Sequence, residues 1–212
     1  MKLPGNRDKK IIDGTHRIVF YLLPLLGLAF LLWYIKNAAC DVVYSDYIRL
    51  VNSYLPDVFN PEKFFVADVL TRIPINYLSR IINVKFFGFS ITFDRVLGAV
   101  SVSLAAWCFA AYSRQLKINI KWFITFMIVM FSLNKWEMLT NGSGWSHFFA
   151  FACFYYHQIL FDRYYRGQER KWDKTILMLL PWLIILGTAG PYCAIYAVVM
   201  ILASGAADDT AG

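Results

Sequence analysis

The stretch IVFYLLPLLGLAFLLWYI, residues 18–35, is an almost unbroken apolar run near the start of the chain. A helix needs about 20 apolar residues to cross a hydrocarbon core about 30 Å thick, so this run is long enough for one membrane span. Basic residues precede the run, as they do in a signal peptide, but the apolar core of a signal peptide has only about 7–15 residues. We therefore interpret residues 18–35 as an uncleaved first span.

The composition of the 212-residue chain is typical of a membrane protein. Hydrophobic residues make up 58% of it and aromatic residues 18%, whereas a soluble domain is about 45–50% apolar. The net charge of +7 comes from basic residues in short clusters between apolar runs, which argues against a nucleic-acid partner. The four cysteines lie far apart and match no ligand spacing, so the sequence predicts no metal site built from them.

Four further apolar regions approach the length of a membrane span, and they are residues 96–112, 122–133, 145–161 and 176–203. Glycines and Pro191 interrupt the last region, which predicts either one long kinked span or two short spans joined near residue 190. The sequence therefore predicts an all-α integral membrane fold with five or six transmembrane helices. These helices form one polytopic domain, residues 1–203, and the abrupt polar tail, residues 204–212, is what a truncated chain would have.

Clusters of basic residues predict the orientation of these spans. One cluster precedes the first span, a second lies between the second and third spans, and a third lies between the fourth and fifth. Cytoplasmic loops carry an excess of Lys and Arg, so we expect a multi-pass protein of the cell membrane with a cytoplasmic N-terminus. Residues 36–94 then form a long extracytoplasmic loop, and residues 134–144 form a short one.

The long outer loop carries helical patterns rather than the composition of a linker. In residues 45–55 the apolar side chains recur at helical spacing. From Pro61 onward apolar residues mix with basic ones, and Pro74 interrupts the pattern. We interpret this part as amphipathic helices that lie in the outer interface of the membrane.

Asp41 and Asp46 are the candidate catalytic residues, because both closely follow the outer end of the first span. A carboxylate at a membrane surface can take a proton from a hydroxyl group or hold a divalent cation, which is the one cofactor that the pattern suggests. Asp46 is the favoured residue of the two. The alternatives are that both acids are solvated loop residues, or that Asp46 caps the helix that follows it.

Candidate substrate-binding residues lie in both outer loops. Arginines suit a lipid phosphate, because the guanidinium donates several hydrogen bonds in one plane. Tryptophan faces suit a sugar, although tryptophan is also common at membrane interfaces. The candidates, which include one acidic residue and one histidine, are Arg49, Arg72, Arg80, Trp136, Glu137, Trp145 and His147.

The layout of spans and loops resembles the GT-C class of polytopic glycosyltransferases, which use polyprenyl-phosphate sugars as donors. The stretch FSLNKWEMLTNGSGWSHFFAFACFYYHQILFDRYYRG, residues 131–167, is also similar to bacterial cell-envelope membrane proteins of that general kind. In that class an acidic residue of the first outer loop is the catalytic base or lies beside a metal ion, and Asp46 or Asp41 would take that place here. The class has more spans and often a distal domain, so the chain would be its N-terminal part.

The resemblance implies a membrane enzyme that transfers a sugar from a polyprenyl-phosphate donor to a glycan or lipid acceptor of the cell envelope, at the outer face of the membrane. Its partners would be membrane lipid and the lipid-linked sugar. Two other functions stay open: a transporter or flippase subunit of envelope polysaccharide assembly, and a non-catalytic membrane scaffold. Charged residues in mid-span would favour the transporter, and the first three predicted spans contain almost none.

Overall fold

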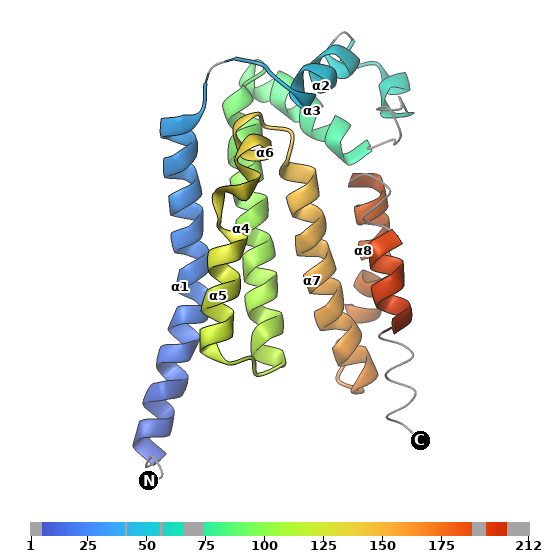
Figure 1. The fold of residues 1–212 in the computed structure, drawn as a ribbon. Coiled ribbons are helices and arrows are strands. Elements are labelled where there is room, and N and C mark those ends of the chain that lie inside the picture. Colours follow the sequence, from blue (N-terminus) through green and yellow to red (C-terminus); the bar gives the residue numbers. More distant parts are fainter. Residues whose placement is uncertain (1–5, 41, 56, 66–73, 188–193, 203–212) are drawn as a thin grey trace.

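The structure is a computed structural model, and it describes residues 6–40, 42–55, 57–65, 74–187 and 194–202. Every regular element in these ranges is helical, so the predicted all-α fold is confirmed. Most of the helices form an upright bundle, and a smaller group lies across one end of it (Figure 1). We call this smaller group the cap.

The bundle consists of helices that correspond to the apolar runs of the sequence. The first helix begins at the end of the bundle opposite the cap and runs toward the cap (Figure 1). The bundle helices are α1 (Asn6–Ala38), α4 (Ile91–Gln115), α5 (Ile120–Met130), α7 (Trp145–Tyr165) and α8 (Asp173–Gly187), and residues 194–202 are also helical.

The cap is built from the long outer loop. It consists of α2 (Asp46–Tyr54), the 3-10 helix η1 (Pro61–Phe65) and α3 (Pro74–Phe87). A second, short connection joins α5 to α7 through η2 (Leu133–Lys135) and α6 (Trp136–Thr140). The two segments that we expect outside the membrane therefore lie at the same end of the bundle (Figure 1).

Among the described residues, two helices are long and apolar enough to cross a membrane. They are the part Ile18–Ala38 of α1, which has 21 residues, and α4, which has 25. The third to fifth predicted spans correspond to α5, α7 and α8, which have 11, 21 and 15 residues. α8 ends at Gly187, inside the last apolar run, and residues 194–202 are again helical. The total number of spans stays a prediction.

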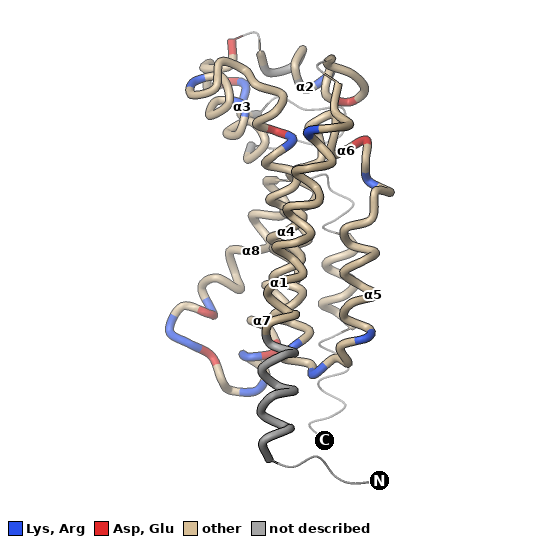
Figure 2. Tube along the Cα trace, turned by 90° about the vertical axis from the view of Figure 1, so that its left-hand side faces the viewer, with Lys and Arg blue, Asp and Glu red and all other residues tan. Residues whose placement is uncertain are grey.

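Charged residues gather at the two ends of the bundle and are scarce between them (Figure 2). Large apolar side chains of the bundle helices point outward, among them Leu25 and Leu26 on α1, Ile128 on α5, and Met178 and Trp182 on α8, each exposed by half or more. Water-soluble monomers rarely expose large continuous apolar patches. The distribution is typical of a bundle whose sides are covered by lipid.

α4 lies at the centre of the bundle, and its small residues let neighbouring helices pack closely. It contacts α1 and α7, and its Ala99, Ser103 and Ala106 side chains are fully buried. Small side chains at helix contacts allow two backbones to approach each other inside a membrane. A second close approach occurs at Gly27 of α1, where an added Cβ atom would overlap the ring of Phe131.

Candidate functional site

A buried ion pair joins the cap to the bundle. Nη2 of Arg80, in α3, lies 2.7 Å from Oδ1 of Asp94, in the first turn of α4, and Nη1 of the same guanidinium donates to Oδ2. The exposed fractions of the two residues are only 1% and 0%. Because ionised groups lose their hydration on burial, such a pair is stable only when further hydrogen bonds satisfy it.

Two further side chains form hydrogen bonds with this pair, although the buried Nε of Arg80 has no hydrogen-bond partner among the described residues. The hydroxyl group of Tyr47, from α2, donates to the Asp94 carboxylate and accepts a hydrogen bond from Nη1 of Arg80 at 2.8 Å. The side-chain amide of Asn83 donates to Oδ2 of Asp94 at 2.9 Å. Burial raises the pKa of Tyr47, so its hydroxyl group stays protonated and able to donate. These four residues, which we call the buried network, join α2, α3 and α4.

Arg95, the residue after Asp94, joins further elements at this end. Its buried side chain donates from Nε to the carbonyl oxygen of Thr140 at 2.5 Å and from Nη2 to the carbonyl oxygen of Cys40. α4 is therefore bonded both to the chain just after α1 and to the end of α6. Neither Asp94 nor Arg95 is among the site residues predicted from the sequence. The signal that could have identified them is a pair of adjacent charged residues at the start of an apolar helix. A charged side chain that is buried there needs hydrogen-bond or ion-pair partners.

The loop between α6 and α7 lies against the buried network. Gly142 in this loop has a φ of 81°, in the left-handed region that favours glycine. A Cβ atom at this position would lie 3.1 Å from Cβ of Asp94 and 3.3 Å from the ring of Tyr47. The short outer loop therefore depends on a glycine for its close contact with the cap.

The exposed part of the site lies where the two outer loops meet. Oγ of Ser45 donates a hydrogen bond to Oε1 of Glu137 at 2.7 Å. The hydroxyl groups of Tyr44 and Thr140 are hydrogen-bonded to each other at 2.6 Å. These bonds connect residues that are 92 and 96 positions apart in the sequence.

Asp46 lies next to this contact, at the first position of α2, and its side chain is 72% exposed. The carboxylate accepts a hydrogen bond from Nη1 of Arg49 at 3.4 Å and interacts electrostatically with His147 near the start of α7. In the described part of the chain it accepts no hydrogen bond from a backbone amide, so it does not act as a helix cap there. We call Asp46, Arg49, Glu137 and His147 the junction.

The other predicted site residues do not belong to the junction. Trp145 is buried and donates a hydrogen bond from Nε1 to Oδ1 of Asn76 at 3.1 Å, so it joins α7 to α3. Arg80 belongs to the buried network, and Trp136 is 51% exposed at the start of α6. The substrate-binding roles of these three residues stay predictions. Two further predicted residues, Asp41 and Arg72, lie outside the described ranges.

The junction contains three groups that can gain or lose a proton, namely the carboxylates of Asp46 and Glu137 and the imidazole of His147, together with the permanent positive charge of Arg49. An exposed carboxylate can act as a general base, an imidazole can act as an acid or a base, and a guanidinium can hold a phosphate. Within the described ranges, no group of three or more His, Cys, Asp or Glu side chains is placed to hold a metal ion. The predicted divalent cation therefore has no ligand set among these residues.

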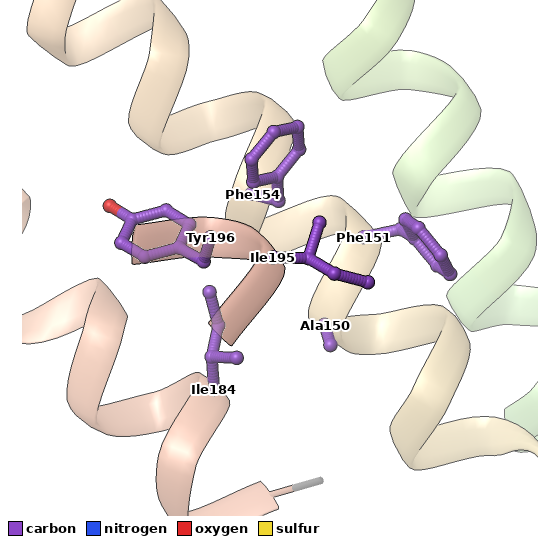
Figure 3. Close-up of a pocket in the computed structure, with 6 residues that line it drawn as sticks. All are labelled: Ala150, Phe151, Phe154, Ile184, Ile195 and Tyr196. Carbon is purple, nitrogen blue, oxygen red and sulfur yellow. The ribbon is translucent and has the colours of Figure 1, made fainter. Parts of the chain in front are cut away.

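Apolar cavities lie along α7, between the helices of the bundle. One of about 80 Å³ lies between α7, α8 and residues 194–202, with Phe154, Ile184 and Tyr196 in its wall (Figure 3). Another of about 300 Å³ lies between α4, α7 and α8. A larger one of about 380 Å³ lies between α4, α5 and α7. No residue of the junction lines these three cavities.

No family model, curated protein or solved structure matches the chain. The function is therefore inferred from the residues of the junction and from their place in the fold.

Proposed function

We propose that the chain is a multi-pass membrane protein with a cytoplasmic N-terminus, whose cap and junction face the outside of the cell. The basic residues support this orientation. Those that follow α4 and α7, such as Lys117, Lys121, Arg166 and Lys171, lie at the end of the bundle opposite the cap. Cytoplasmic loops are the ones enriched in Lys and Arg.

We further propose that the last apolar run forms two spans, which makes six in total. α8 runs back toward the cap, where it contacts α3. Residues 194–202 run in the same direction as α7. Ile195 shares a cavity with Ala150, whereas Met200 accepts a hydrogen bond from Gln158, two turns further along α7. The direction of the chain thus reverses between α8 and residues 194–202, as it does between successive spans.

We propose that this protein is a glycosyltransferase of the GT-C type, and that the junction is its active site. The observation that carries the proposal is the exposed carboxylate of Asp46, which pairs with Arg49 and directly follows Ser45, the residue that bonds Glu137 at the contact between the two outer loops. A base must be free to accept a proton, and this carboxylate is neither buried nor occupied by backbone amides. A lipid-linked sugar in the outer leaflet would reach the protein at this end of the bundle.

The proposed reaction is a substitution at the anomeric carbon of the donor sugar. An acceptor hydroxyl group forms the new bond to this carbon while Asp46 takes the hydroxyl proton. The bond between the anomeric carbon and the phosphate oxygen breaks, and the polyprenyl phosphate leaves with the electron pair. Arg49 can hydrogen-bond the departing phosphate, because a guanidinium pairs well with phosphate oxygens.

The variant Asp46→Asn tests this function. Removing a general base lowers a rate by about 10²–10⁴-fold, so Asp46→Asn should lose sugar transfer while it inserts normally into membranes. The measurement is the transfer of radiolabelled sugar by protein in nanodiscs supplied with a panel of polyprenyl-phosphate-linked hexoses and an envelope lipid extract.

Asp57→Asn is the matched control for this experiment. Asp57 is an exposed acid of the same outer loop, and its φ of 61° is a conformation that asparagine tolerates. The control should transfer sugar at the wild-type rate. Equal transfer by wild type and Asp46→Asn would contradict the proposal and would favour a membrane scaffold or a flippase subunit.

A further inference from the structure

The cavity between α4, α5 and α7 is an apolar groove with one charged residue in its wall. Its volume is about 380 Å³, and its walls include Ala105 of α4, Phe126 and Val129 of α5 and Phe151 of α7. Lys135, in η2 just after α5, is the charged residue among those that line it. A hydrocarbon chain suits the apolar walls, and a negative head group suits the ammonium. The groove therefore has the chemistry to bind an anionic amphiphile.

Among the described residues, the ammonium group of Lys135 has two hydrogen-bond acceptors, which leaves one of its donors unused. Its ammonium group donates to the carbonyl oxygens of Met130 and Ser132 at 2.7 and 2.9 Å, at the end of α5. An ammonium group has three donors, and the ion pairs among the described residues leave Lys135 without a carboxylate partner. Burial lowers the pKa of Lys135, because it withdraws the ammonium from water. An anion beside it would offset this cost.

The groove opens on a side of the bundle that faces lipid in the proposed topology. Phe126, Val129 and Phe151 are 45%, 62% and 43% exposed. Lys135 follows the cap-side end of α5, which corresponds to the level of the outer head groups. Phospholipids meet this surface at a far higher concentration than any scarce amphiphile, so mass action favours them as occupants.

We propose that the groove binds an anionic phospholipid of the outer leaflet, with one acyl chain between α4, α5 and α7 and the phosphate against Lys135. The proposal rests on the membrane orientation proposed above and does not depend on glycosyl transfer. A lysine near a membrane surface strengthens the binding of anionic lipid about fivefold. Lys135 would thus select for charge, and the apolar walls would hold the chain.

Photocrosslinking tests this proposal at the level of single residues. The full chain is placed in nanodiscs with phosphatidylglycerol that carries a photoactivatable group in one acyl chain, and crosslinked peptides are identified by mass spectrometry. Crosslinks should fall near Val129 and Phe151. Lys135→Gln should reduce them about fivefold, and Lys135→Arg should retain them. Lys36→Gln, which removes an exposed lysine at the outer end of α1, should leave them unchanged.

A second variant tests the acyl chain separately from the charge. Ala105→Leu fills the groove and should displace the crosslinks although Lys135 remains, whereas Ala111→Leu, at an exposed position of the same helix, should not. A thermal unfolding transition like that of the wild type confirms that each variant is folded. If Lys135→Gln does not fold, the comparison of Ala105→Leu with Ala111→Leu still decides whether the groove holds the chain.

Three results would overturn the proposal. They are equal crosslinking of phosphatidylcholine, unchanged crosslinking in Lys135→Gln, and displacement of phosphatidylglycerol by polyprenyl phosphate at a lower concentration. The last result would make the groove a site for a lipid carrier rather than for a phospholipid. Because the readout is crosslinking, it is independent of the sugar-transfer assay of Asp46→Asn, so the two proposals succeed or fail separately.

Discussion

At the scale of single residues, one buried carboxylate organises the contact between the cap and the bundle. The oxygens of Asp94 accept hydrogen bonds from Tyr47, Arg80 and Asn83, so side chains of three helices meet at one group. Asp94 also lies in the first turn of α4, where the helix dipole favours a negative charge. The charge is stabilised only while these partners remain, so the stability of the cap should depend on each of them.

Asp94→Asn should lower the free energy of unfolding by about 3–5 kcal/mol, because it leaves the guanidinium of Arg80 buried without a counter-charge. The double variant Arg80→Met/Asp94→Leu should lose less, because it removes both buried charges. Denaturant unfolding in detergent measures both losses. A single variant that is as stable as the wild type would show that the ion pair does not hold the cap.

The stability of the cap should also depend on pH through Tyr47. Burial raises the pKa of Tyr47; the charge of Arg80 opposes this rise and that of Asp94 adds to it. An unfolded tyrosine has a pKa of about 10, so the folded protein holds this proton more tightly than the unfolded chain does. The protonated hydroxyl group of Tyr47 therefore contributes its full stabilisation below about pH 10. This stabilisation is lost as the pH rises through the higher pKa of the folded state.

Unfolding midpoints of wild type and Tyr47→Phe, measured from about pH 8 to pH 12, check this prediction. Tyr47→Phe should be less stable at neutral pH, because it loses the hydrogen bond to Asp94. The unfolding midpoint of Tyr47→Phe should fall less steeply at alkaline pH than that of the wild type. Burial also raises the pKa of Tyr77, so part of the decline should persist in both proteins. Identical pH profiles would refute the assignment to Tyr47.

At the scale of elements, α3 is an amphipathic helix with an unusual orientation. Its polar side faces the protein interior and its apolar side faces outward, which is the reverse of an amphipathic helix on the surface of a water-soluble protein. Its polar Asn76 and Arg80 are buried, while Leu78, Ile82 and Phe86 are 46%, 44% and 69% exposed. The exposed residues are four positions apart and form one stripe. The polar side faces inward because Trp145 and Asp94 supply its hydrogen-bond partners. The apolar stripe is therefore exposed on the surface of the protein. We expect it to contact the outer interface of the membrane.

Spin labels can test where this stripe lies. A nitroxide attached through Ile82→Cys in a cysteine-free background should collide with oxygen more often than with a polar nickel complex, because oxygen concentrates in lipid. A nitroxide attached through Asn52→Cys, at an exposed position of α2, should show the opposite preference and serves as the control. A preference for the nickel complex at both positions would place α3 in water.

At the scale of the whole molecule, the proposed topology places the cap outside the cell. Cys40 is exposed just beyond α1, so a membrane-impermeant thiol reagent should label it on intact cells, and Cys40→Ser should remove this signal. In the Cys40→Ser background, the variant Glu169→Cys adds a thiol at an exposed position between α7 and α8, and it should react only after the membrane is opened. The reverse pattern would put the junction in the cytoplasm and would contradict an outer-face transferase.

The candidate site was partly predictable from its residues. The sequence predicts Asp46 from its place after the first apolar run, Arg49 from the affinity of a guanidinium for phosphate, and Glu137 and His147 from their place in or beside the second, short loop. The structure brings these two loops together through the hydrogen bond between Ser45 and Glu137. Arg80 was selected for its charge, but its neighbours in the sequence do not reveal that it is buried. Burial depends on whether a distant residue can satisfy the guanidinium, and local patterns carry no information on this.

The sequence by itself determined the all-helical fold, the apolar runs that become bundle helices, and the placement of charges between those runs. These features follow from interactions between residues that lie within a few turns of each other. Only the tertiary structure decided which side of α3 faces inward, which acid pairs with Arg80 and which loops meet at Asp46. The partners of Arg80 lie 14 and 33 positions away, and that of Ser45 lies 92 positions away. Such pairs are selected by the cost of burying polar groups after the helices have packed, and no local pattern encodes that cost.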